Sequence, residues 1–248
     1  MTLNKEADEI DPRTYYIIRG FLDETRDNAT AENQTASLIL PTTWLITKNE
    51  SIRNIEKMPF DTNNVDASVC ANFLFGLIYQ LIQNPEEVTL TAELEQMMLD
   101  TSKLLVYTIH NLIEVRPDLI LVYYPSKYDF YWFVARIVHL LKRQKSLIEP
   151  LQQILLELES AMKEKGTSHI LSKSVEKKNA VHWSEFIGNY AGKDRDDDAI
   201  FSTAVALNAL LDLWTRREGQ EVKYDSDTPD KVKDVIQKGV RYITEQLR

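Results

Sequence analysis

Hydrophobic residues along the chain form two kinds of segment. In the first kind they recur every three or four residues between charged positions, which predicts amphipathic helices with one buried side. These segments are Glu93–Val115, Ser146–Lys165 and 229–247. In the second kind nearly every position is apolar, and a helix that is apolar on every side is expected to be buried on every side. These segments are Ala67–Ile82, Phe130–Leu141 and Ala199–Trp214.

The remaining segments are shorter or more polar. Tyr15–Thr25 has apolar residues on one side and predicts a first helix. Ala36–Ile46 is compatible with either a helix or an extended chain. Pro117 is expected to close the preceding helix. Thr167–Asp194 and Glu218–Asp227 are polar and are expected to be connections without regular structure.

Two stretches of the chain resemble each other and indicate an internal repeat. One starts at Asp61 and the other at Asp194, and in both an acidic or amide-rich lead precedes an apolar helix. A third apolar segment lies between them, so the simplest unit is a helical hairpin of about 65 residues. Such hairpins predict an all-α fold in two layers, an α/α toroid or partial toroid, with an open solenoid as the alternative. Residues 1–14 form a polar lead, and residues 15–248 form one domain.

Composition limits the function. The net charge of −9 and the pI near 5.1 disfavour nucleic acid and anionic membranes as partners. Cys70 is the only cysteine, which excludes an internal disulfide and a thiolate-rich zinc site. No apolar run is long enough for a transmembrane segment, and the first eleven residues lack the apolar core of a secretory signal. These features predict a soluble, cytoplasmic protein.

Four aspartates occupy five positions immediately before the apolar segment Ala199–Trp214. Three interpretations fit Asp194, Asp196, Asp197 and Asp198. Clustered carboxylates raise one another's pKa and are suited to acid catalysis. They would also bind Mg²⁺ or Ca²⁺, with Asp194, Asp196 and Asp198 as ligands. They would equally serve as a solvated helix start, where negative charge complements the helix dipole.

The stretch Asp194-Arg195-Asp196-Asp197-Asp198-Ala199 resembles the Asp-x-Asp-Asp-Thr-Ala motif of class II terpenoid cyclases. These cyclases are α/α toroids related to the β-subunits of protein prenyltransferases. The resemblance implies an apolar, isoprenoid-like ligand, with Asp196 as the proton donor and Asp194 and Asp197 as its supporting residues. Asp198 stands where the family has threonine. The resemblance implies no cofactor.

Aromatic residues are further candidates for a binding site. Tyr124, Tyr128, Tyr131 and Trp132 would line a ligand pocket and stabilise a carbocation through their ring faces. His182 and Trp183 lie in the long polar connection that leads to the acidic cluster, where they would act as lid or general base. For both groups the alternative is packing in the core.

Three functions therefore remain open. The first is a terpenoid-cyclase-like protein that binds an apolar ligand and uses acid catalysis by Asp196. The second is a non-catalytic interaction scaffold. The third is a carbohydrate-active α/α-barrel enzyme, in which Asp129 would face one of the aspartates at 194–198 across a cavity. A partial toroid further predicts a homo-oligomer or a partner chain that completes the ring.

Overall fold

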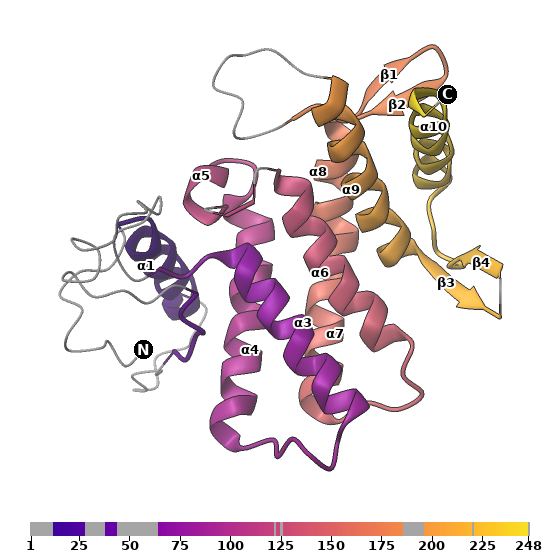
Figure 1. The fold of residues 1–248 in the computed structure, drawn as a ribbon. Coiled ribbons are helices and arrows are strands. Elements are labelled where there is room, and N and C mark those ends of the chain that lie inside the picture. Colours follow the sequence, from indigo (N-terminus) through magenta and orange to yellow (C-terminus); the bar gives the residue numbers. More distant parts are fainter. Residues whose placement is uncertain are drawn as a thin grey trace, which may run out of the picture.

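The computed structural model describes residues 12–27, 38–43, 64–121, 123–124, 126–185, 196–219 and 221–247. It is mainly helical, as the sequence predicts (Figure 1). Its elements in chain order are α1 (Pro12–Asp27), α3 (Ala67–Gln83), α4 (Ala92–Tyr107), the π-helical turn η1 (Thr108–Leu112), α5 (Pro117–Ile120), α6 (Lys127–Lys142), α7 (Glu149–Ala161), the π-helical turn η2 (Met162–Gly166), α8 (Thr167–Ser172), β1 (Val175–Lys177), β2 (Ala180–His182), α9 (Asp196–Trp214), β3 (Thr215–Glu218), β4 (Glu221–Tyr224) and α10 (Asp230–Gln246).

The three apolar helices α3, α6 and α9 lie side by side and begin at the same end of the molecule (Figure 1). α4 packs against α3 and α7, and α7 also packs against α6. α10 packs against α9 and β2. The alternation of apolar and amphipathic segments therefore corresponds to an alternation of inner and outer helices. The mainly helical fold is as predicted, whereas the toroid stays a prediction.

Short polar side chains fix where several helices begin. The carboxylate of Asp66 accepts a hydrogen bond from the backbone N–H of Val69 at the start of α3, at 2.9 Å. Thr91 caps α4 in the same way, and the hydroxyl of Ser126 accepts from the N–H of Tyr128 at the start of α6. These caps satisfy backbone donors that have no partner within the helix.

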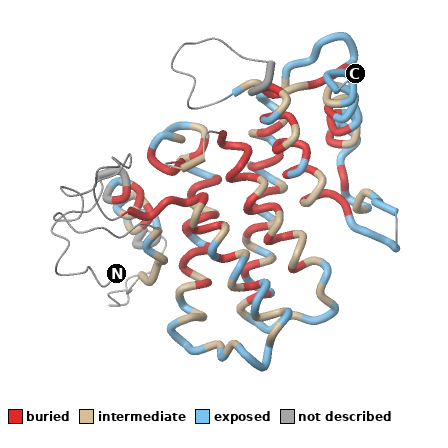
Figure 2. Tube along the Cα trace, in the orientation of Figure 1, coloured by how far each residue is buried: buried red, intermediate tan, exposed pale blue. Residues whose placement is uncertain are grey.

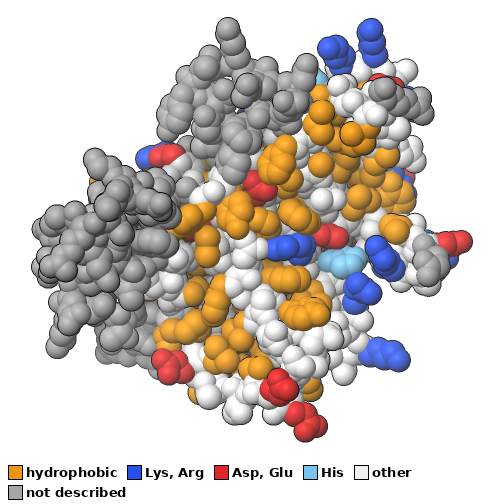
Figure 3. All heavy atoms as spheres, viewed as in Figure 1, with side chains coloured by type: hydrophobic (Ala, Val, Ile, Leu, Met, Phe, Trp, Pro, Cys, Tyr) orange, Lys and Arg blue, Asp and Glu red, His pale blue; other side chains and the backbone are white. Residues whose placement is uncertain are grey.

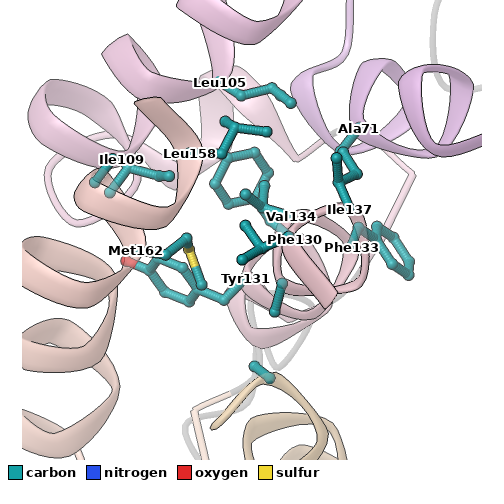
Figure 4. Close-up of a cluster of buried hydrophobic side chains, with 14 of the residues drawn as sticks. Ala71, Leu105, Ile109, Phe130, Tyr131, Phe133, Val134, Ile137, Leu158 and Met162 are labelled. Carbon is teal, nitrogen blue, oxygen red and sulfur yellow. The ribbon is translucent and has the colours of Figure 1, made fainter. Parts of the chain in front are cut away.

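The core is built around α6, which is buried on most sides (Figure 2). Figure 4 shows Phe130 and Val134 pointing toward Leu105 of α4 and Leu158 of α7. Cys70 of α3 is fully buried as well, and burial raises the pKa of its thiol. Among the described residues, no helix has the length and apolar character needed to cross a bilayer.

The helical segment α4–η1 ends before Pro117, as predicted, and Pro117 also begins α5, because proline fits the first helical position, where no N–H is needed. Two other predictions about the connections are wrong. The described part of Thr167–Asp194 contains α8 and the antiparallel hairpin β1–β2, whose turn places Lys178 and Asn179 at positive φ. Glu218–Asp227 overlaps a second hairpin, β3–β4, which turns at Gly219 with φ of 65°.

Candidate functional site

Isolated polar residues on the exposed sides of α3, α6 and α9 meet in one cluster. α6 presents Trp132, Arg136 and His139, which follow one side of the helix at the i, i+4, i+7 spacing. α3 contributes Asn72, and α9 contributes Asp212. All five residues are half-buried. We call these five residues the arginine cluster.

The guanidinium of Arg136 is held between aromatic rings. Its central carbon lies 4.7 Å from the ring centroid of Phe75 and 4.9 Å from those of Trp132 and Phe133. Its Nη2 donates a hydrogen bond to the Oδ1 of Asn72, whereas its Nε is buried and has no hydrogen-bond partner in the part of the chain that the structure describes. No carboxylate of the described residues forms an ion pair with this guanidinium. Cation–π contacts thus take the place of a salt bridge.

Asp212 is the acidic member of the cluster. The indole Nε1 of Trp132 donates to its Oδ2 at 3.1 Å, and the Nδ1 of His139 lies 3.2 Å from its backbone oxygen. Burial raises the pKa of Asp212, while His139, the Trp132 hydrogen bond, Arg136 and Arg217 lower it. Burial also lowers the pKa of Arg136, and the charge of Asp212 opposes this effect. A single carboxylate is therefore surrounded by several basic groups.

Large apolar side chains are exposed around the cluster. Phe73 and Tyr79 of α3 are 36% and 43% exposed, and Phe201 of α9 is 43% exposed. Figure 3 shows hydrophobic side chains gathered over α3, α6 and α9, with a few charged side chains and a histidine among them. We call the exposed sides of these three helices the inner-helix face. It combines aromatic surface with positive charge.

Two of the predicted ligand-binding residues lie at this face. Trp132 is a member of the arginine cluster. The hydroxyl of Tyr124 accepts a hydrogen bond from the Nδ2 of Asn72 at 3.3 Å. The ring of Tyr124 meets that of Phe133 edge-on, with 4.8 Å between centroids.

The other predicted aromatic residues lie elsewhere. Tyr128, Tyr131 and Trp183 are fully buried in the core. The indole Nε1 of Trp183 donates to the backbone oxygen of Ile170 at 2.7 Å, which ties the chain after β2 to α8. The ring of His182 stacks on that of Tyr242 with centroids 4.9 Å apart. The structure does not bring these side chains together with Trp132 in one pocket.

The predicted acidic site falls largely outside the described part of the chain. Asp194 lies between the described ranges that end at residue 185 and begin at residue 196. Asp196, Asp197 and Asp198 form the start of α9, but their side chains are not described. Acid catalysis and Mg²⁺ binding by these residues therefore stay predictions. Among the described residues, no group of three or more His, Cys, Asp or Glu side chains is arranged to hold a metal ion.

Asp129, the predicted partner in a carbohydrate-active site, lies in the first turn of α6 and is 4% exposed. Its Oδ2 is buried, and no described residue forms a hydrogen bond with it. Burial raises the pKa of Asp129 to about 6, and a backbone hydrogen bond from Ser126 opposes this shift. The carboxyl group is therefore protonated in mildly acidic solution.

A second polar network lies on another side of α6, next to the π-helical turns. Lys127 is almost fully buried and pairs with Glu114 and Glu185, each at 2.8 Å. The hydroxyl of Tyr131 lies 3.1 Å from Glu114 and 2.9 Å from the Nδ1 of His169. Every charge in this network has a partner, as expected for a structural anchor.

The sequence pattern alone does not single out Asn72, Arg136 and Asp212 as a site. The signal was present, because each is an isolated polar residue in an otherwise apolar helix. A helix that is buried on most sides can carry a polar residue on the one side that faces solvent or a partner. What the sequence did not reveal is that the three positions face one another.

No family model matches the chain, no curated protein matches it, and no solved structure matches it. The function is therefore inferred from the geometry of the inner-helix face.

Proposed function

We propose that the protein is a non-catalytic interaction scaffold that binds an acidic, partly apolar protein segment on its inner-helix face. The observation that carries this proposal is Arg136, a guanidinium that is held in place by three aromatic rings and has no carboxylate partner among the described residues. A preorganised arginine of this kind is suited to form a charge-assisted hydrogen bond with an incoming carboxylate.

The surroundings of Arg136 support a protein partner. Trp, Tyr and Arg are the residues that most often dominate the energetics of protein interfaces. The inner-helix face supplies Trp132 and Arg136 at its centre, with Tyr79, Phe73 and Phe201 exposed around them. An extended face of this composition matches the apolar centre of an interface better than the deep pocket of a small molecule.

Charge supports an acidic partner. The whole chain carries a net charge of −9. The basic groups of Arg136, Arg217 and His139 nevertheless converge around Asp212. Arg217 forms no ion pair with a described residue. A carboxylate on a short segment would gain from this local positive charge. A polyanion such as nucleic acid would instead be repelled by the rest of the molecule.

We also propose that the layered hairpins are part of an α/α toroid. Parallel inner helices α3, α6 and α9, each followed by an outer helix, are the repeating unit of such a ring. In a ring of this kind the inner-helix face would line the central opening. A second copy or another chain that completes the ring stays a prediction, as does acid catalysis by Asp196.

Selection from a random peptide display library tests the proposed function. The wild-type protein should enrich peptides that combine Asp or Glu with aromatic or aliphatic residues. Arg136→Gln should lose this enrichment, with affinity for the selected peptides reduced about 30-fold, or about 2 kcal/mol. Arg19→Gln is the matched control, because Arg19 is an exposed arginine of α1 whose side chain is 66% accessible.

Far-ultraviolet circular dichroism should show the same helical content in all three proteins. The proposal is wrong if no acidic peptides are enriched, or if the Arg136→Gln protein enriches the same peptides as wild type.

A further inference from the structure

Gly76 is an exposed glycine in the middle of α3. A Cβ built at this position has no atom within 4 Å, so open space lies over the backbone there. A glycine inside a helix makes the helix less stable than an alanine would. Packing within the described part of the chain therefore gives no reason for a glycine at this position.

Aromatic side chains lie on both sides of Gly76 along α3. Phe73 precedes it and Tyr79 follows it, each by three residues, so Gly76 lies between them on the solvent-facing side of the helix. The ring of Tyr79 stacks on that of Phe75, with 6.2 Å between centroids. None of the 17 residues of α3 is charged. The space over Gly76 therefore interrupts an aromatic, uncharged part of the inner-helix face, and we call it the Gly76 gap.

The Gly76 gap lies beside the guanidinium of Arg136. Asn72, which accepts a hydrogen bond from the Nη2 of Arg136, precedes Gly76 by one helical turn, or about 6 Å along the axis. The same guanidinium lies over the ring of Phe75, the residue before Gly76. A segment whose carboxylate binds Arg136 would therefore bring a second side chain to Gly76.

We propose that the Gly76 gap receives one large apolar side chain of the bound segment, aromatic or branched aliphatic, next to the acid that binds Arg136. Side chains about 6 Å apart on one side of a segment are four positions apart in a helix and two in a strand. The aromatic rings beside the gap favour such a side chain because the contact buries apolar surface on both partners. This assignment rests on the function proposed for the inner-helix face and narrows its partner.

Gly76→Gln tests the proposal, because glutamine is a good helix former and fills the gap with a polar side chain. The probe is the tightest-binding acidic peptide selected on the wild type. Isothermal titration calorimetry should show that its affinity falls about tenfold or more in Gly76→Gln. Urea unfolding should show that the variant is no less stable than wild type. Ser160→Gln, at an exposed position of α7, is the control and should leave affinity within about twofold.

A change in the peptide locates the contact. The selected peptides should carry a large apolar residue two or four positions from an acidic one. Alanine in place of this apolar residue should weaken binding to the wild type about tenfold. The same replacement should weaken binding to Gly76→Gln by less than about twofold, because the gap is already filled.

The proposal is overturned if Gly76→Gln binds the peptide as tightly as wild type while Arg136→Gln does not, a result that leaves the function proposed for the inner-helix face intact. It is also overturned if the alanine peptide loses the same affinity for wild type and for Gly76→Gln. If no acidic peptide is enriched, or if Arg136→Gln binds it unchanged, the proposed function fails and the assignment of the Gly76 gap fails with it.

Discussion

Arg136 shows how a charge is kept at a half-buried position without an ion pair to any described residue. Burial disfavours the guanidinium and lowers its pKa, but three aromatic faces and the Asn72 amide compensate for the lost water. Such an arrangement fixes the orientation of the guanidinium before any partner arrives. A preorganised donor loses less conformational entropy on binding than a mobile surface arginine.

Asp212 should weaken the binding of acidic segments because it lies beside the basic groups. Asp212→Asn keeps a hydrogen-bond acceptor for the indole of Trp132 but removes the negative charge. We expect affinity for an acidic peptide selected on the wild type to rise about fivefold, or about 1 kcal/mol. Isothermal titration calorimetry at low salt measures this change. An unchanged or weaker affinity would show that Asp212 does not oppose the incoming carboxylate.

Asp129 makes stability depend on pH. Its pKa in the folded protein, about 6, lies above the ordinary value of 3.8, so the folded state favours the protonated form. The stability that protonation supplies is fully present below about pH 4 and is lost as pH rises through 6.

Asp129→Asn should therefore be more stable than wild type by about 2–3 kcal/mol at pH 8, and equal to it near pH 4. Urea unfolding across this pH range measures the difference. A difference for Asp129→Asn that is the same at every pH would contradict the effect of burial.

At the scale of elements, periodicity predicted which segments are helical but overestimated the burial of the apolar ones, since Phe73 and Tyr79 of α3 are 36% and 43% exposed. Segments that are apolar on most sides became α3, α6 and α9, and the amphipathic segments became α4, α7 and α10. The two hairpins were missed for a physical reason. Their strands are only three or four residues long, and the β1–β2 turn uses Lys178-Asn179 at positive φ in place of glycine.

Gly76 lowers the stability of α3 without a packing role. It lies inside the helix, and a Cβ built there has no atom within 4 Å. Gly76→Ala should stabilise the protein by about 0.5–1 kcal/mol, because alanine has the higher helix propensity.

Gly239 of α10 provides the contrast, since a Cβ there would lie 2.7 Å from the Cδ2 of Leu207. Gly239→Ala should stabilise the protein less than Gly76→Ala does, or not at all. Urea unfolding of both variants distinguishes the two cases. A Gly76→Ala protein that is no more stable than wild type would argue against an open, exposed position.

For the whole molecule, the sequence predicted a mainly helical fold, because its apolar residues recur at helical spacing or fill whole helical segments. It did not predict how polar residues of different helices meet. Asn72, Arg136 and Asp212 lie far apart in the chain, and only the packing of α6 between α3 and α9 brings them together. Tyr128 and Tyr131 were predicted beside Trp132, but successive helical residues point in different directions, and these two lie in the core.

The central claim is that a partner binds the inner-helix face, and the indole resonances of the tryptophans test it most directly. Among the described residues, Trp132 lies on this face with its Nε1 bonded to Asp212. Trp183 and Trp214 are buried elsewhere, with their Nε1 atoms bonded to Ile170 and Thr167. A ¹⁵N-labelled protein, with the peaks assigned by single Trp→Phe variants, is titrated with a selected acidic peptide. We predict that the Trp132 indole peak shifts while those of Trp183 and Trp214 stay in place. A peptide that binds without moving the Trp132 peak would contradict the proposed binding face.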